Sequence, residues 1–127
     1  MKRIVASAHN HGLYFEQHCC GKAESLVPVM IEAGVDMWCG QPGVNDQDML
    51  AQKYKNEPIV IGVGNPPIPN DASDEELRNI AKDWVDRYKD CHVAAIFGLA
   101  PNFGEPAYQK FKNYVYEYSR IAYQNYE

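Results

Sequence analysis

The stretch LYFEQHCCGKAESLVPVMIEAGVDMWC, residues 13–39, contains the unit of structure that is repeated along the chain. It opens with an apolar run at Leu13–His18 and closes with a second one at Val35–Cys39. Between them, ESLVPVMIEAG has helical spacing and ends at Gly34, a residue type that commonly terminates helices. Pro28 fits only near the first turn of that helix. The stretch therefore predicts a strand, a helix and a second strand.

The same succession continues to the end of the chain. Apolar runs recur at Ile59–Val63 and Val93–Phe97, and helical patterns follow at 45–55, at 73–89 and from Pro106. These runs lack the strict alternation of a sheet with one wet face, so they predict parallel strands joined by right-handed crossovers. The predicted fold class is α/β, with a leading helix and four β–α units. Such a chain is half of a (β/α)₈ barrel or a small open sheet.

The helical segments carry start signals and apolar stripes. Ser73 followed by Glu76 is a capping box, and the helix at 45–55 begins on Asn45 or Asp46. The last helix holds more tyrosines than one face can bury, so some must be exposed or lie in an interface: Tyr108, Tyr114, Tyr116, Tyr118, Tyr123 and Tyr126. The side chains expected to be buried are Met49, Leu50 and Tyr54; Leu77, Ile80, Ala81, Trp84, Val85 and Tyr88; and Tyr108, Phe111, Val115, Tyr118 and Ala122.

Length and composition fit one domain, residues 1–127, with a real core: 46% of the residues are hydrophobic and 12% aromatic. The formal charge of −5 argues against a nucleic-acid surface. The apolar runs are too short to span a bilayer, and the histidines near the start do not suit a signal peptide. We therefore expect a cytoplasmic protein, whose four cysteines are thiols, metal ligands or a nucleophile rather than disulfides.

In a parallel α/β sheet, chemistry collects where the strands end. If the first strand persists to Cys20, its side chain shares a face with His18 and Glu16. Imidazole and thiolate suit zinc, and Cys39 at the end of the next strand could supply a third ligand. Burial of these thiols without a metal is the alternative. Glu16 is a candidate general base or fourth ligand, with an ion pair to a lysine as its alternative.

Candidate substrate-binding residues near the same strand ends are Trp38, Gln41 and Asn65. Sequence leaves open whether Asp36 and Trp38, or Met37 and Cys39, point into the barrel. Gly62-x-Gly64 lacks the lysine of a phosphate loop. The remaining histidines are expected to be structural rather than ligands: His9 and His11 near a helix end, and His92 before its strand.

The stretch HGLYFEQHCCGKAESLVPVMIEAGVDMWCGQP resembles the uroporphyrinogen decarboxylase superfamily, which includes the decarboxylase of haem synthesis and cobalamin-dependent methyltransferases. His18, Cys20 and Gly21 match its His-x-Cys-Gly pattern, and a helix ending IEAGVD and Gln41 follow in the family's order. IGVGN, SDEELRN and FGLAPNFGEPAYQKF resemble its later segments. The match covers nearly the whole chain, but only about the last third of a typical member. It implies a TIM barrel whose first four strands are not in this sequence.

In the methyltransferase branch, the resemblance implies zinc on His18 and Cys20, plus a cysteine on the last strand, and a partner protein carrying a corrinoid. Phe97 stands where the family has that last cysteine, so Cys39 or Glu16 would have to substitute. A tetrapyrrole decarboxylase and a catalytically silent interaction module are the alternative functions. The open sheet edges would be covered by homodimerisation of two half-barrels or by a separate amino-terminal half.

Overall fold

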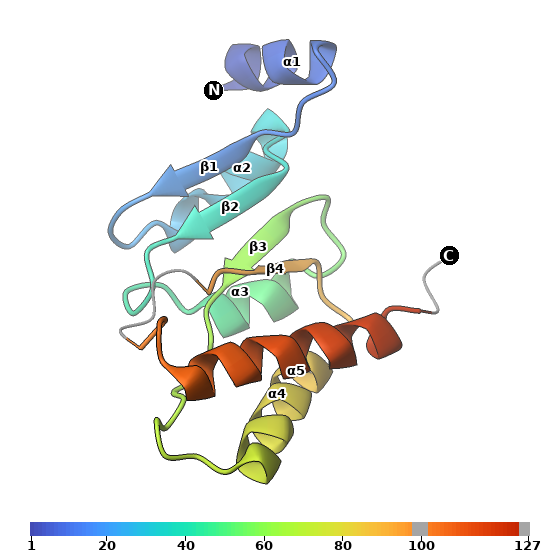
Figure 1. Cartoon of the computed structure of the whole chain (residues 1–127). Helices are drawn as coiled ribbons and strands as arrows, with labels where there is room; N and C mark the ends of the chain where they lie inside the picture. The colour runs from blue at the N-terminus through green and yellow to red at the C-terminus, as the bar shows by residue number, and fades with distance from the viewer. Residues whose placement is uncertain (98–101, 125–127) are drawn as a thin grey trace. The chain divides into compact units, whose positions relative to one another are not determined.

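The computed structural model describes residues 1–97 and 102–124 of the chain (Figure 1). The chain divides into two compact units, and the first comprises Met1–Val63 with Cys91–Ala95. The second comprises Gly64–Asp90 with Ile96–Glu127. The sheet lies in the first unit and the two long helices lie in the second. That the two units are one domain stays a prediction.

The first unit contains a four-stranded, all-parallel sheet in the order β1-β2-β3-β4. The parallel α/β fold predicted from the sequence is therefore confirmed. Each strand is shorter than the apolar run that predicts it. For example, Leu13 and Tyr14 precede the first strand, and the last strand ends before Phe97. The strands are β1 Glu16–Cys19, β2 Met37–Gly40, β3 Val60–Val63 and β4 Val93–Ala95.

Helices connect the first three strands. In the first unit, α1 Lys2–Asn10 precedes β1, η1 Glu24–Leu26 and α2 Val27–Ala33 lie between β1 and β2, and α3 Gln47–Lys53 lies between β2 and β3. As predicted, α2 has Pro28 in its first turn and ends at Gly34, whose φ of 82° places it in the left-handed region. Asp46 caps α3 by accepting a hydrogen bond from Met49 N at 2.9 Å.

One core prediction for α3 is wrong. Leu50 is fully buried and Tyr54 is 8% exposed, but Met49 is 41% exposed. Leu50, Ala51 and Tyr54 form the inward stripe, and Met49 lies one step of about 100° outside it.

The strand register gives the sheet two different faces. Because Glu16 lies opposite Met37 and His18 opposite Cys39, these side chains share one face. Glu16 and His18 are exposed there. The other face carries Trp38, Ile61 and Val63, which are 0%, 1% and 0% exposed. The alternation left undecided by the sequence is thus resolved: Trp38 points into the core, and Cys39 toward the face of His18.

Gly40 makes room for the indole of Trp38. A Cβ atom at Gly40 would lie 2.6 Å from a Trp38 ring carbon, closer than real contacts allow. The indole Nε1 donates to Cys19 Sγ at 3.1 Å. Cys19 therefore belongs to the packed side of β1, and its neighbours His18 and Cys20 are left to the other side.

The second unit is built on α4 Asp74–Tyr88 and α5 Pro106–Ala122, which pack against each other. The predicted capping box is present, since Ser73 Oγ accepts from Glu76 N and Glu76 Oε2 accepts from Ser73 N. The α5 prediction is confirmed for Tyr108, Phe111 and Val115, which are 0%, 0% and 5% exposed. Tyr118 and Ala122 are only half-buried.

The expected surplus of tyrosines is confirmed in part. Tyr116 is 65% exposed and Tyr123 38% exposed, whereas Tyr108 and Tyr114 are buried. Tyr126 lies outside the described residues. In the described part of the chain, no helix combines the length and apolar character needed to span a membrane.

Asp36 ties the starts of β1 and β2 to α1. Its Oδ2 accepts hydrogen bonds from Phe15 N and from His9 Nε2, both at 2.7 Å. Burial raises the pKa of Asp36, but these hydrogen bonds and the charge of His9 outweigh it, so the pKa lies below its usual value. The carboxylate form thus favours the folded state.

We predict that Asp36→Asn lowers the free energy of unfolding by about 1–2 kcal/mol at neutral pH. A depressed folded-state pKa contributes stability above the unfolded pKa, and that stability is lost as the pH falls through the folded pKa. The variant should therefore lose less stability on acidification than the parent chain. Urea unfolding at several pH values measures this, with the exposed Asp71→Asn as control. Equal acid slopes for Asp36→Asn and the parent would contradict the prediction.

Candidate functional site

The candidate site lies at the carboxyl ends of β1 and β2. Cys20 is one residue beyond β1, and its Sγ is 3.6 Å from Nε2 of His18. Both side chains are exposed. The alternation of the strand, continued by one residue, brings these two donors to the same face, as the sequence predicts.

A backbone carbonyl of β2 sets the orientation of His18. Nδ1 of His18 donates a hydrogen bond to the carbonyl oxygen of Cys39 at 2.7 Å. A carbonyl can only accept, so Nδ1 carries the proton and the neutral ring has its lone pair on Nε2. That lone pair belongs to the nitrogen beside Cys20. The same fixing of one ring nitrogen by a backbone carbonyl is common in metal-binding histidines.

The spacing of the two donors fits a zinc ion. Zinc binds cysteine sulfur at about 2.3 Å and histidine nitrogen at about 2.0–2.1 Å, so tetrahedral angles separate the two atoms by about 3.5–3.6 Å. The observed separation of 3.6 Å between Nε2 of His18 and Sγ of Cys20 matches this value. As the thiol and neutral imidazole, the pair can equally form an S–H···N hydrogen bond.

Cys39 and Glu16 interact with each other on this face. Burial raises the pKa of the Cys39 thiol to about 12, and a hydrogen bond and repulsion from the Glu16 carboxylate add to the shift. The thiol therefore stays protonated at neutral pH and donates to Glu16. A metal bound to Cys39 would first have to displace that proton.

Within residues 1–97 and 102–124, no group of three or more His, Cys, Asp or Glu side chains is arranged to hold a metal ion. His18 and Cys20 supply two potential metal ligands. Cys39 as a third ligand, and Glu16 as a base or fourth ligand, stay predictions.

The three predicted substrate-binding residues do not share one environment. Trp38 is fully buried, and its side chain lies on the face of the sheet opposite His18. Gln41 follows β2, and its Oε1 accepts a hydrogen bond from Gly21 N at 2.7 Å. In the second unit, Asn65 Oδ1 accepts from the Tyr108 hydroxyl at 3.2 Å. Binding roles for all three stay predictions.

Phe97 belongs to the aromatic cluster of the second unit. Its ring centroid is 5.5 Å from that of Trp84 and 5.6 Å from that of Phe111. Packing in a cluster of this kind explains an aromatic residue at this position. The segment that follows, residues 98–101, lies outside the described residues.

The other histidines have structural partners. His9, in the last turn of α1, pairs with Asp36. Nδ1 of His11 donates to the carbonyl of Ser7, which places it at the carboxyl end of the same helix, as expected. Nδ1 of His92 donates to the carbonyl of Glu57 at 3.1 Å.

Sequence reasoning did not identify the role of Asn45, which is 8% exposed and joins the loops after β1 and β2. The pattern NDQDM offers both Asn45 and Asp46 as helix caps, and Asp46 is the cap. Since Asp46 alone is sufficient to cap α3, the adjacent Asn45 is free for another role. If its side-chain amide is buried, it needs hydrogen-bond partners elsewhere, and that was the available signal.

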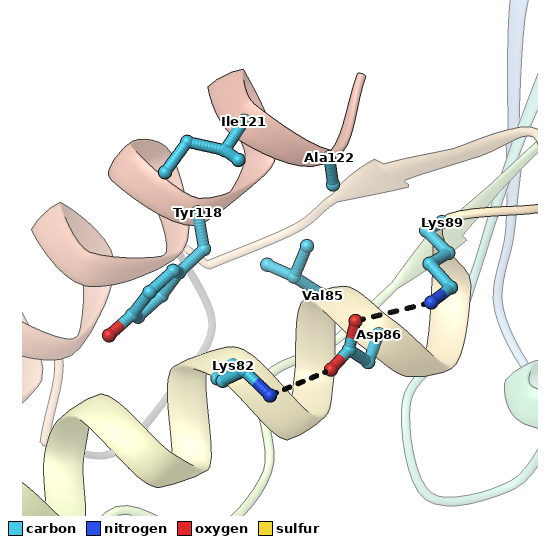
Figure 2. Close-up of a pocket in the computed structure, with 7 residues that line it drawn as sticks. All are labelled: Lys82, Val85, Asp86, Lys89, Tyr118, Ile121 and Ala122. Atoms are coloured by element: carbon cyan, nitrogen blue, oxygen red, sulfur yellow. Dashed lines mark hydrogen bonds and ion pairs between the residues drawn. The ribbon is translucent and has the colours of Figure 1, made fainter. Parts of the chain in front are cut away.

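The second unit has a hollow that is lined by residues of α4 and α5 (Figure 2). On α4, Asp86 accepts hydrogen bonds from Lys82 and Lys89, each at 3.4 Å. The α5 side is formed by Tyr118, Ile121 and Ala122. These exposed ion pairs and apolar groups offer no arrangement for bond-breaking chemistry, so the candidate site remains at the ends of β1 and β2.

Comparison with known proteins gives no support from homology. No protein-family model matches the sequence, and a search among curated proteins finds no match.

We predict that Cys20 is the fastest thiol to alkylate. Cys20 is exposed and Cys19 intermediate, whereas Cys39 and Cys91 are buried and the raised pKa of Cys39 keeps it protonated. Iodoacetamide labelling of the native chain, followed by peptide mass spectrometry, measures the order. Cys20→Ser should remove the fast phase and Cys19→Ser should retain it. Labelling of Cys39 as fast as Cys20 would contradict the prediction.

Proposed function

We propose that this chain is one half of a barrel enzyme resembling the methyltransferase-like branch of the uroporphyrinogen decarboxylase superfamily. In this proposal, His18 Nε2 and Cys20 Sγ bind zinc on the open face of the sheet. The observation that carries it is their 3.6 Å separation, with Nδ1 of His18 held by the Cys39 carbonyl. Two donors at the spacing of a tetrahedral edge, one already in the correct tautomer, are two of the three protein ligands that a catalytic zinc site uses.

Zinc bound there would favour the thiolate form of a substrate thiol, which is the form that accepts a methyl group. The protein's own part is to hold His18 and Cys20 as ligands and to accept the thiol proton. Glu16 has a carboxylate on the same face, two residues before His18, and is the acceptor we propose. Displacement of Cys39 from its hydrogen bond would leave that carboxylate able to take the proton.

A catalytic zinc site uses three protein ligands, and His18 and Cys20 supply two. Since Phe97 replaces the cysteine of the family, we propose Cys39 as the third ligand, which leaves Glu16 as the proton acceptor. Glu16 is the alternative third ligand, and in that arrangement it would not accept the proton. The four-stranded parallel sheet would become a closed barrel by pairing with a second copy or with a separate amino-terminal half. The methyl donor would be a corrinoid carried by a partner protein. A reducing cytoplasm suits this site, because its cysteines must remain thiols.

Cobalt(II) is the direct probe, because its visible absorption reports four-coordinate geometry and thiolate ligation. We predict uptake of one equivalent by the parent chain and competition by zinc. His18→Ala and Cys20→Ala should each weaken binding by more than about 100-fold, since loss of even an outer partner of a ligand costs about 10–100-fold. The isolated chain is expected to bind metal without turnover, as half of the barrel is missing.

Cys19→Ser is the matched control. Cys19 adjoins Cys20 but faces Trp38, and serine keeps an acceptor for the indole Nε1. This variant should bind cobalt like the parent. The proposal fails if the parent binds no cobalt, or if Cys19→Ser weakens binding as much as Cys20→Ala.

A further inference from the structure

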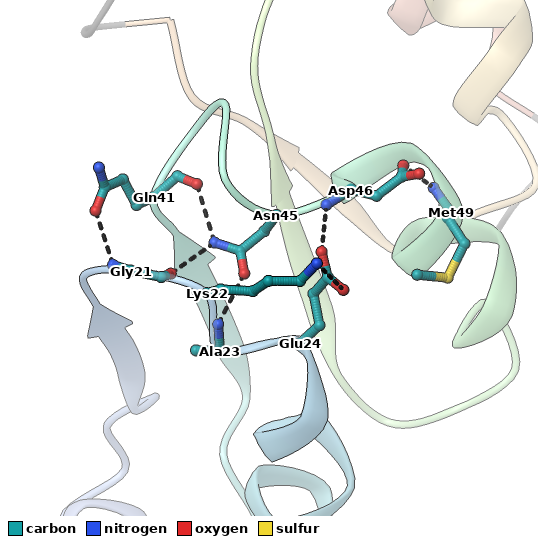
Figure 3. A network of polar contacts seen from close by, with 8 residues as sticks. All are labelled: Gly21, Lys22, Ala23, Glu24, Gln41, Asn45, Asp46 and Met49. Atoms are coloured by element: carbon teal, nitrogen blue, oxygen red, sulfur yellow. Dashed lines mark hydrogen bonds and ion pairs between the residues drawn. The ribbon is translucent and has the colours of Figure 1, made fainter.

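The loop that follows Cys20 is held by a network of hydrogen bonds around Asn45 (Figure 3). Asn45 Oδ1 accepts from Ala23 N at 2.9 Å, and Nδ2 donates to the carbonyls of Gly21 and Gln41, both at 3.0 Å. All three bonds of this buried amide go to backbone groups. It therefore fixes the paths of two loops without using any side chain of theirs.

Two further contacts join the same pair of loops. Gln41 Oε1 accepts from Gly21 N at 2.7 Å, and Glu24 Oε1 accepts from Asp46 N at 2.7 Å. Gly21 has a φ of 78°, a left-handed conformation that directs the chain sharply away from the strand. Both amide side chains, Asn45 and Gln41, thus contact the residue immediately after Cys20.

His18 and Cys20 are positioned by different means. His18 lies within β1, and the Cys39 carbonyl fixes its ring. Cys20 lies beyond the last residue of β1, so its direction depends on the backbone that continues into Gly21. The separation of Nε2 and Sγ is therefore the joint result of the strand register and the loop network.

We propose that Asn45 and Gln41 are positioning residues that set the distance between His18 and Cys20 and so prepare the two-donor site for a metal. This inference rests on the proposed zinc function for its purpose, but its structural part is independent of metal. A rigid loop lets the metal bind without the ordering cost that a flexible one would carry.

The test compares cobalt affinity in Asn45→Ala, Gln41→Ala and the parent chain. We expect each variant to weaken cobalt binding by about tenfold, the lower end of the effect of outer-shell partners, and to alter the thiolate absorption. Gln41→Glu retains an acceptor oxygen for Gly21 N and should bind as the parent does. Gln41 is exposed, so its variants keep the test valid if Asn45→Ala does not fold.

Asn102→Ala is the matched control for loss of an asparagine network. Asn102 Nδ2 donates to the Ile68 carbonyl at 2.9 Å and to Asn70 Oδ1 at 3.1 Å, within the second unit. Its loss should cost stability without changing cobalt affinity. Equal affinity in Asn45→Ala, Gln41→Ala and the parent, together with unchanged rates of Cys20 alkylation, would overturn the inference, as would an equal loss of affinity in Asn102→Ala.

A second readout needs no metal. In the metal-free chain, the rate of Cys20 alkylation should fall in Asn45→Ala and Gln41→Ala to the value measured in His18→Ala, because the imidazole no longer lies beside the thiol. If the parent binds no cobalt but these rates fall, the zinc function fails and the positioning role stands. If the parent binds cobalt and neither readout changes in the variants, the positioning role fails alone.

Discussion

The hydrogen bond from His18 Nδ1 to the Cys39 carbonyl is the constraint on which the candidate site depends. It exists because β1 and β2 are parallel with His18 opposite Cys39, and a shift by one residue would turn His18 into the packed side. The bond fixes both the ring and its tautomer. The placement of the Nε2 lone pair beside Cys20 follows from that orientation.

Contacts on the packed side of the sheet stabilise the pairing of β1 with β2 that places His18 opposite Cys39. Trp38 occupies the space above Gly40 and binds Cys19, which fixes the register of the same two strands. Successive side chains along β1 and the residue after it consequently lie on opposite faces of the sheet. Cys19 packs against Trp38, whereas His18 and Cys20 are exposed on the other face. A pair of neighbouring cysteines therefore reflects the alternation of a strand, with no need for a bond between them.

Much of this fold is predictable from the sequence because its signals are local. The capping box at Ser73 and the terminating Gly34 are found where expected, and each apolar run contains a strand that is shorter than the run or shifted by a residue. Met49 was misjudged because capping by Asp46 fixes where α3 starts but not the width of its buried stripe.

Only the part of the site that lies along a single strand is predictable from the sequence. That His18 and Cys20 share a face follows from period two, but the contacts of Cys39 with His18 and Glu16 depend on register between strands. The partners of Asn45 lie 22, 24 and 4 residues away along the chain, so no local pattern identifies them. The buried position of Trp38 likewise depends on which face the helices cover.

The tautomer of His18 can be measured by nitrogen-15 NMR of its ring in the metal-free chain, at a pH about two units above the ordinary imidazole range. We expect a proton on Nδ1 and none on Nε2, because Nδ1 donates to the Cys39 carbonyl, and we expect the same spectrum in Cys19→Ser. A His18 ring protonated on Nε2, or a rapid average of both tautomers, would contradict this expectation.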